Sequence, residues 1–341
     1  MNKAQKVNYL VKRLGIKKTI MHYLGKKDNE YICMYDHYYS KLKKDQYLNE
    51  LCEWYDYALG RKSDCVINPK TFNDKIQWMK LNCVDEIRTV CSDKFAVREY
   101  IKNAIGEDYL IPLLGKWDSF SDIDFDRLPQ KFVLKSNTGS GRIIIVSDNQ
   151  ASNPIFLKRE LDMWQRIPFG YNGMEIQYLP IVRSIIAEQY IEEMDGSLHD
   201  YKFHCFNGAP ALVEFMGERD LVNHTSTETW CDINFNPLNI VEKLDGNFAN
   251  YTGECKKPKN YDKMLEIVRI LCEPFMYVRV DLYNLEGKIL FDELTFTPDN
   301  GLDQWETEDT DEKIGRLLIL DPQAKQTEEN LLKQVHEFFE N

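Results

Sequence analysis

Residues 278–298 have the sequence VRVDLYNLEGKILFDELTFTP, which predicts two strands joined by a tight turn. Side chains alternate between the two faces of a strand, so each half of the segment sorts into two sets. One face of the first strand carries Tyr277, Arg279, Asp281 and Tyr283, and the other carries Val278, Val280 and Leu282. On the second strand, one set is Ile289, Phe291, Glu293, Thr295 and Thr297. The other set is Leu290, Leu294 and Phe296. The chain must therefore build a sheet with a charged face, and its fold must give those charges partners or a ligand.

The register of this hairpin decides which charges meet. A three-residue loop over 285–287 places Arg279 opposite Glu293, with Asp281 diagonal to Glu293 on the same face. Two carboxylates at that spacing can share a cation. The alternative is a cross-strand ion pair between Arg279 and Glu293, with Asp281 solvated. The hairpin alone leaves both interpretations open.

Length, charge and cysteine usage narrow the class of protein. The 341 residues can form two or three subdomains, and a net charge of −12 argues against an extended nucleic-acid surface. Nine cysteines without a CxxC pair argue against a disulfide framework or a zinc ribbon. There is no signal peptide and no apolar run long enough to span a bilayer. We expect a cytoplasmic protein with reduced thiols that does not bind nucleic acid.

The N-terminus departs from the acidic character of the chain. Residues 1–27 contain eight Lys and Arg and no Asp or Glu, so the rest of the chain carries −20. Val7, Leu10, Val11 and Leu14 have helical spacing. Such a basic amphipathic helix can lie on an anionic membrane, here at its inner face. The commoner outcome, which we favour because Gly15 shortens the pattern, is a helix packed on its own domain.

Strands and helices interleave without regular alternation of βα units, which favours an α+β fold over a doubly wound sheet. Helices are predicted within 28–66, from a cap at Asn73, over 93–103 and over 261–272, and at the C-terminus. Strands are predicted at 131–135, 142–146 and 183–191, and after a loop around Asp195 and Gly196.

The stretch KFVLKSNTGSGRIIIV, residues 131–146, places Lys135 at a strand end before two glycines. Glycines let backbone N–H groups approach phosphate oxygens, and a lysine offsets their charge. The spacing is neither a Walker loop nor a Rossmann fingerprint. By itself the stretch could equally be a hairpin turn.

Six segments together are more specific. In chain order they are PKTFNDKIQWMKL, SDKFAVREYI, YLIPLLGKWDSF, LPQKFVLKSNTGSG, DYKFHCFNG and VRVDLYNLEGKILFDELTFTP. Over about residues 60–320 the chain resembles the ATP-grasp superfamily, most closely its TupA-like branch, which is associated with bacterial polysaccharide biosynthesis. The resemblance implies two α+β subdomains that clasp a nucleotide, at 91–190 and 191–341, after a helical region at 1–90.

The resemblance also implies roles for individual residues. Those expected to bind ATP are Arg98 and Lys135 at the phosphates, Gly139, Ser140 and Gly141 in the mobile loop, and Glu188, Gln189, Tyr190 and Ile191 at the adenine. Arg279 and Lys202 would act on the transferring phosphoryl group, and Asp281 and Glu293 would hold Mg²⁺. The chain departs from the family at Thr295, where many relatives have Asn as a further metal ligand, and at Ser136 in the loop. The departure at Thr295 leaves the number of metals open, and the one at Ser136 could alter loop closure or substrate contact.

The function that the resemblance implies is an ATP- and Mg²⁺-dependent carboxylate–amine ligase that forms an amide through an acyl phosphate. Its substrates would be an amino acid and a uronic-acid-containing glycan or nucleotide-sugar of surface polysaccharide or capsule. One alternative is a glycosyltransferase of the same process, for which DID at 122–124 is a weak DxD match. Another is a nucleotide-binding protein without catalysis.

Overall fold

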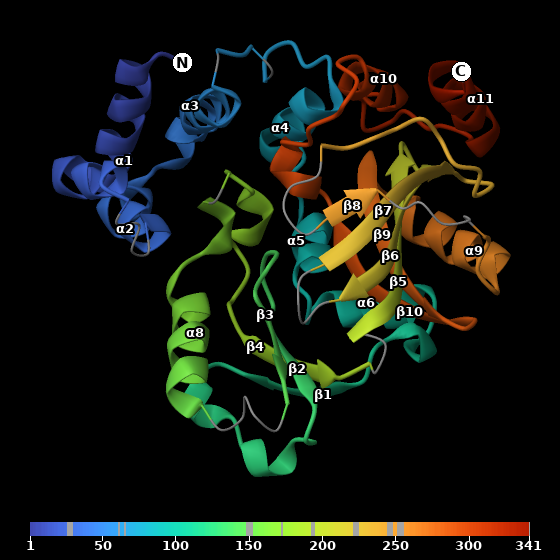
Figure 1. The fold of residues 1–341 in the computed structure, drawn as a ribbon, viewed down its shortest axis with the longest axis horizontal. Coiled ribbons are helices and arrows are strands. Elements are labelled where there is room, and N and C mark those ends of the chain that lie inside the picture. The colour runs from blue at the N-terminus through green and yellow to red at the C-terminus, as the bar shows by residue number, and fades with distance from the viewer. Residues whose placement is uncertain are drawn as a thin grey trace.

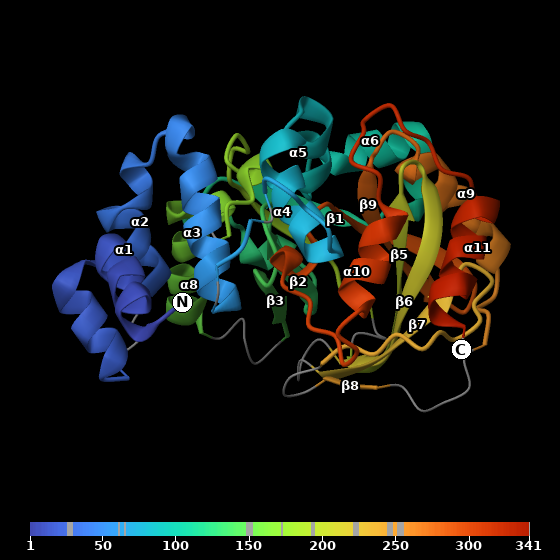
Figure 2. The same ribbon diagram turned by 90° about the horizontal axis from the view of Figure 1, so that it is seen from above.

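The computed structural model describes residues 1–25, 30–60, 62–64, 66–147, 153–171, 173–191, 195–220, 225–243, 248–250 and 256–340. Its elements form three parts, which follow one another from left to right in Figure 2. Helices α1–α3 make up one end, a four-stranded sheet with α8 lies in the middle, and a six-stranded sheet with the C-terminal helices forms the other end (Figure 1).

The N-terminal part contains α1 (Lys3–Tyr23), α2 (Glu30–His37) and α3 (Tyr47–Leu59). Helix α1 is interrupted at Gly15, whose φ of 77° and ψ of 163° are not helical. In its first half Leu10 and Leu14 are buried, and the fully buried Arg13 binds Glu50 through N–O distances of 2.7 and 2.8 Å. The apolar face predicted for residues 7–14 therefore packs on its own domain.

The small sheet has the strand order β1-β4-β2-β3 and is antiparallel throughout. Its strands are β1 (Leu113–Trp117), β2 (Phe132–Ser136), β3 (Ile143–Val146) and β4 (Ile185–Gln189). Helix α8 (Pro154–Arg166) covers one face, where Leu157, Leu161 and Trp164 pack on Phe132 and Leu134. Because side chains alternate, Val133 and Lys135 point to the other face, and Val133 packs against Leu290 of the large sheet.

The large sheet has the order β10-β9-β5-β6-β7-β8. Its strands are β5 (Asp195–Phe206), β6 (Ala209–Asp220), β7 (Thr225–Asp232), β8 (Phe248–Asn250), β9 (Tyr277–Leu285) and β10 (Lys288–Thr295). One face packs on α5 (Glu86–Ser92), α6 (Val97–Ala104) and α9 (Tyr261–Cys272). One end of the other face packs on α4 (Phe72–Asn82), α10 (Thr310–Leu317) and α11 (Glu328–Phe339). Beyond that apolar cluster the face carries charged side chains.

The hairpin of β9 and β10 forms, but its predicted register is wrong. Glu286 and Gly287 have φ angles of 53° and 104°, so they make a two-residue turn that pairs Leu285 with Lys288. A bulge between Phe291 and Glu293 shifts the pairing again. Asp281 consequently lies directly opposite Glu293, and Arg279 lies opposite Thr295.

The bulge also changes which residues share a face. Val278, Val280 and Leu282 are in the core as predicted. Ile289 and Phe291 lie in that core too, together with Leu294 and Phe296, whereas Glu293 and Thr295 bond to the Arg279 side. The predicted grouping of Ile289 and Phe291 with Glu293 is therefore wrong, because the extra residue Asp292 reverses the alternation.

Three predicted boundaries also differ. Thr71, and not Asn73, caps α4, and the Asn73 side chain instead bonds Asp311 and Asp303. The helix expected from residue 93 begins at Val97, because the Asp93 carboxylate accepts the backbone N–H groups of the next turn. Residues 195 and 196 belong to β5.

The helix over 261–272 is confirmed, and the domain limits stay a prediction. The small sheet spans 113–189, and residues 86–104 pack on the large sheet. Seven described cysteines are free thiols; Cys65 and Cys255 lie outside the described residues. None of the described helices is long and apolar enough to cross a membrane.

Candidate functional site

Charged side chains from three segments meet where the small sheet faces β9 and β10. Glu188 on β4 accepts Arg98 at 3.0 Å on one carboxylate oxygen and Lys135 at 2.8 Å on the other. Arg98 also donates to the carbonyl of Ile111 at 2.6 Å. The sequence-predicted residues Arg98, Lys135 and Glu188 thus form one ion-pair cluster.

Lys135 connects this cluster to the large sheet. Its ammonium lies 3.5 Å from Asp292, the bulge residue of β10. Burial opposes its charge, but Glu188 and Asp292 outweigh burial and hold the pKa of Lys135 above its usual value. Lys135 therefore stays protonated, and the bulge aims a carboxylate across the gap between the sheets.

The two carboxylates predicted to hold metal are cross-strand neighbours. Asp281 accepts a bidentate pair from Arg279, at 2.9 Å from Nε and 2.7 Å from Nη2. Thr295 donates to Glu293 at 3.2 Å. Burial raises the pKa of Asp281 to about 7 although Arg279 lowers it, whereas for Glu293 burial is outweighed by Lys94 and Arg279, which lower its pKa.

Lys94 is a site residue that the sequence reasoning missed. Its ammonium forms an ion pair with Glu293, and its backbone N–H donates to Asn137 at 2.9 Å. A signal was present, since Lys94 stands four residues before Arg98 in the quoted segment SDKFAVR. Lys94 was not singled out, because its partner Glu293 is distant in the sequence; its segment, expected to be helical, is a turn.

A row of directly paired residues extends the site across the large sheet. Glu293 pairs with Asp281, Asp281 with Lys202, and Lys202 with Glu214. The Lys202 ammonium binds Glu214, which also lies 3.3 Å from Nε2 of His204. Burial lowers the pKa of His204, so its ring is neutral. Lys202 is thus held next to Asp281 by its ion pair with Glu214.

Ion pairs join the charged side chains of this site. Five cations meet five carboxylates; they are Lys94, Arg98, Lys135, Lys202 and Arg279, and Glu188, Glu214, Asp281, Asp292 and Glu293. Buried charges need partners, and here they neutralise one another. A triphosphate with a metal ion could exchange these partners, because phosphate oxygens would take over the cations and the metal would take the carboxylates.

The glycine loop, residues 139–141, closely follows Asn137, whose carbonyl accepts the backbone N–H of Lys94. The amide of Asn137 donates to Asp93 and to the Val182 carbonyl, both at 3.0 Å, and accepts from the Ser184 N–H at 2.7 Å. Gly139 and Gly141 have φ angles of 80° and 70°, which glycine adopts readily. A Cβ at Gly139 would lie 2.3 Å from Phe169, whereas one at Gly141 would meet nothing. Ser140, between the glycines, is exposed.

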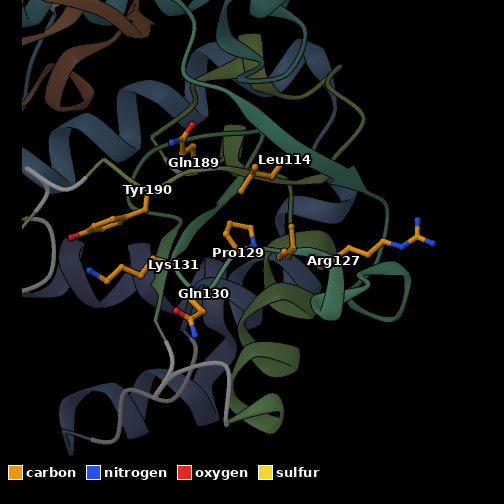
Figure 3. Close-up of a pocket in the computed structure, with 8 residues that line it drawn as sticks. Leu114, Arg127, Pro129, Gln130, Lys131, Gln189 and Tyr190 are labelled. Atoms are coloured by element: carbon orange, nitrogen blue, oxygen red, sulfur yellow. The ribbon is translucent and has the colours of Figure 1, made fainter.

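The residues predicted at the adenine divide between two surfaces. Glu188 points into the charged cluster, and Ile191 is buried beside Ile111 and Val133. Gln189 and Tyr190 line a pocket of about 790 Å³ together with Leu114 and residues 127–131 (Figure 3). The ammonium of Lys131 lies 5.2 Å from the centre of the Tyr190 ring.

The donor set fits a hard divalent cation only in part. Asp281 and Glu293 offer carboxylates, and Thr295 offers a hydroxyl, which are the oxygen ligands that Mg²⁺ prefers. Within the described ranges no group of three or more His, Cys, Asp or Glu side chains could hold a metal. These residues therefore suit a metal that takes its other ligands from phosphate and water.

Comparisons with known proteins identify one family and several similar structures. A family model described as TupA-like ATPgrasp matches residues 74–319. No curated protein sequence matches. Among solved structures, an L-amino acid ligase from Bacillus licheniformis is 13% identical with a TM-score of 0.39, and the match covers 67% of this chain and 50% of that one.

Two further structures are similar. A D-alanine–D-alanine ligase from Helicobacter pylori is 14% identical, has a TM-score of 0.37 and is matched over 72% of this chain and 61% of its own. A D-cycloserine synthetase is 11% identical, with a TM-score of 0.39 and coverages of 80% and 92%. The chain thus spans less than two thirds of the first two structures, and the assignment of a family rests on the family model.

Proposed function

Because the chain belongs to the TupA-like ATP-grasp family, we propose that it is an ATP- and Mg²⁺-dependent ligase that joins a carboxylate to an amine. The observation that carries the proposal is the network of ion pairs between the two sheets, in which cations surround a pair of opposed carboxylates. Such a cluster is suited to phosphoryl transfer, which depends on positioning and on charge stabilisation more than on a nucleophilic side chain.

The proposed reaction has two steps. The γ-phosphoryl group of ATP moves to an oxygen of the substrate carboxylate, which forms an acyl phosphate and releases ADP. The amine then attacks the carbonyl carbon, an amide bond forms, and inorganic phosphate leaves as the nitrogen loses a proton.

The charged residues have distinct tasks in this scheme. Asp281, Glu293 and Thr295 would hold Mg²⁺, which when bound neutralises charge on the triphosphate. Lys94 and Arg279, now paired with these carboxylates, would turn to phosphate oxygens. Arg98 and Lys135 would bind the phosphates from the side of the small sheet, and Lys202 would remain beside the transferring group.

We further propose that one substrate is a glycan or its nucleotide-linked precursor, for example a uronic acid that is joined to an amino acid. The association of the TupA-like branch with polysaccharide biosynthesis supports this choice. The ligase step does not depend on it.

The test is ATP-dependent release of ADP and phosphate across pools of amino acids and uronic-acid sugars, with Mg²⁺ present. In the wild type we expect one pair of pools to stimulate the release of ADP and phosphate. In Asp281→Asn or Lys135→Ala we expect no such stimulation. Lys288→Ala, which removes an exposed lysine at the start of β10, is the matched control and keeps its activity. Substrate-independent ATP binding without turnover would instead support a non-catalytic nucleotide-binding protein.

The glycosyltransferase alternative is tested in the same assay. Asp122 and Asp124 of its DxD match are exposed, and they bond to Ser119 and Arg127 in surface turns. Cleavage of a nucleotide-sugar that survives Lys135→Ala but is lost in Asp122→Asn would establish that alternative and overturn the ligase.

A further inference from the structure

The second half of α1 presents an apolar stripe to solvent. Beyond the break at Gly15, the exposed fractions are 69% for Ile16, 55% for Ile20, 53% for Tyr23 and 66% for Leu24. At 100° per residue these four side chains share one face of the helix. A helix normally buries such an apolar face against another apolar surface.

Other sides of this part of the helix contact the protein. Thr19 is buried at one border of the stripe, and His22, on the far side from the stripe, lies 2.7 Å from Glu30 at the start of α2. The stripe itself is left exposed by these contacts. Its position is set by Gly15, because the φ of 77° there is one that other residues rarely adopt.

Charge accompanies the stripe. Lys17 and Lys18 are exposed, and neither forms an ion pair with any carboxylate that the structure describes. Residues 1–27 contain no acidic residue, whereas the rest of the chain carries −20. An apolar stripe with Lys17 at its edge and Lys18 further round the helix, in an otherwise acidic protein, is complementary to a surface that is apolar inside and anionic outside.

We propose that Ile16, Ile20, Tyr23 and Leu24, here called the α1 stripe, dock on an anionic lipid bilayer. The helix lies in the interface with Ile16, Ile20 and Leu24 in the acyl region and Lys17 at the headgroups. Two helical turns extend about 12 Å, so the segment lies on the membrane and does not cross it. Figure 2 shows α1 at the end of the molecule remote from the large sheet, so docking leaves the charged site accessible.

A second copy of the chain is a poorer occupant. A two-fold contact through the α1 stripe would bring Lys17 of both copies to its rim, and residues 1–27 contain no acidic residue to pair with them. Four side chains also offer far less than the roughly 1,000 Å² that a stable interface buries.

The experiment is co-sedimentation of the full chain with vesicles of phosphatidylcholine, with or without phosphatidylglycerol. We expect binding to the anionic vesicles that falls with added salt. The double variant Ile16→Ser/Leu24→Ser should weaken it by at least about tenfold, as should Lys17→Glu/Lys18→Glu. The matched control is Ile67→Ser/Ile155→Ser, which removes side chains that are 83% and 82% exposed elsewhere, and it should bind like the wild type.

Three results would overturn the proposal. The first is that the wild type does not bind anionic vesicles. The second is that the control variant loses as much vesicle binding as Ile16→Ser/Leu24→Ser. The third is that the protein forms a concentration-dependent dimer that only Ile16→Ser/Leu24→Ser dissociates. Thermal unfolding of each variant shows that it is folded. The assay needs no ATP, so its outcome is independent of the ligase activity.

Discussion

Lys94 and Glu293 are 199 positions apart in the sequence, and their side chains form an ion pair. Glu293 is one of the two carboxylates that fit a metal, so the ammonium occupies a place that the cation would need. The same lysine donates its backbone N–H to Asn137, just before the glycine loop. A metal ion that bound Glu293 would therefore have to replace the lysine.

Replacement of Lys94 should have opposite effects on metal and on nucleotide. In Lys94→Gln, Glu293 loses its strongest competitor, so Mn²⁺ should bind the nucleotide-free protein several-fold more tightly. ATP turnover should fall by at least about tenfold, because one cation for the phosphates is lost. Mn²⁺ titration followed by electron paramagnetic resonance measures the first effect. Lys102→Gln, which removes an exposed lysine on α6, is the control; unchanged Mn²⁺ affinity in Lys94→Gln would refute the competition.

Asp281→Asn tests the paired carboxylate. The amide keeps the shape of the side chain and one acceptor for Arg279, and burial already favours the neutral form of this group. We expect a loss of about 1–2 kcal/mol in the free energy of unfolding, and turnover at least about 100-fold lower. Denaturant unfolding and ADP release measure the two quantities. If the surface variant Asp122→Asn lost as much turnover as Asp281→Asn, the effect would not be specific to the site.

The sequence predicted the faces of β9 correctly, but the faces of β10 and the register of the hairpin incorrectly. Alternation identified Arg279 and Asp281 on one face of β9, because period two is a property of a single strand. The pairing of Asp281 with Glu293 depends on a two-residue turn and on a bulge at Asp292, and no local pattern announces a bulge. Lys94 was missed for a related reason, since its partner is distant in sequence and only the packed fold brings the two together.

Glu175 should make stability depend on pH. It is buried and accepts a hydrogen bond from Thr297, and burial raises its pKa to about 7, above the ordinary value of about 4.3. Between these two values the folded state binds more protons than the unfolded state, so the free energy of unfolding falls as pH rises.

The variant Glu175→Gln removes this titration. We expect it to be more stable than the wild type by about 1–3 kcal/mol at pH 8, with the advantage gone at about pH 4. Urea unfolding at both pH values measures the difference, and Glu312→Gln, at a half-exposed residue of α10, is the control. An advantage of equal size at both pH values would mean that Glu175 is not the titrating group.

Substitutions at Gly139 and Gly141 separate the effect of backbone strain from the effect of contact with Phe169. Alanine at either position adopts a left-handed φ at a cost of about 1–2 kcal/mol, but only at Gly139 does the new Cβ meet Phe169. A loop displaced by this contact would carry its backbone donors away from the phosphates, and a shift of about 1 Å can reduce a rate 100-fold. We therefore expect Gly139→Ala to raise the KM for ATP and lower turnover at least about tenfold more than Gly141→Ala does.

Removal of the contact should reverse the defect. In Gly139→Ala/Phe169→Ala the Cβ has room, so turnover should recover toward that of Phe169→Ala alone, while the strain shared with Gly141→Ala remains. Steady-state kinetics of the four variants gives the coupling between the two positions. If the double variant is no better than Gly139→Ala, backbone strain and not the Phe169 ring limits the loop, and the ring has no part in setting its position.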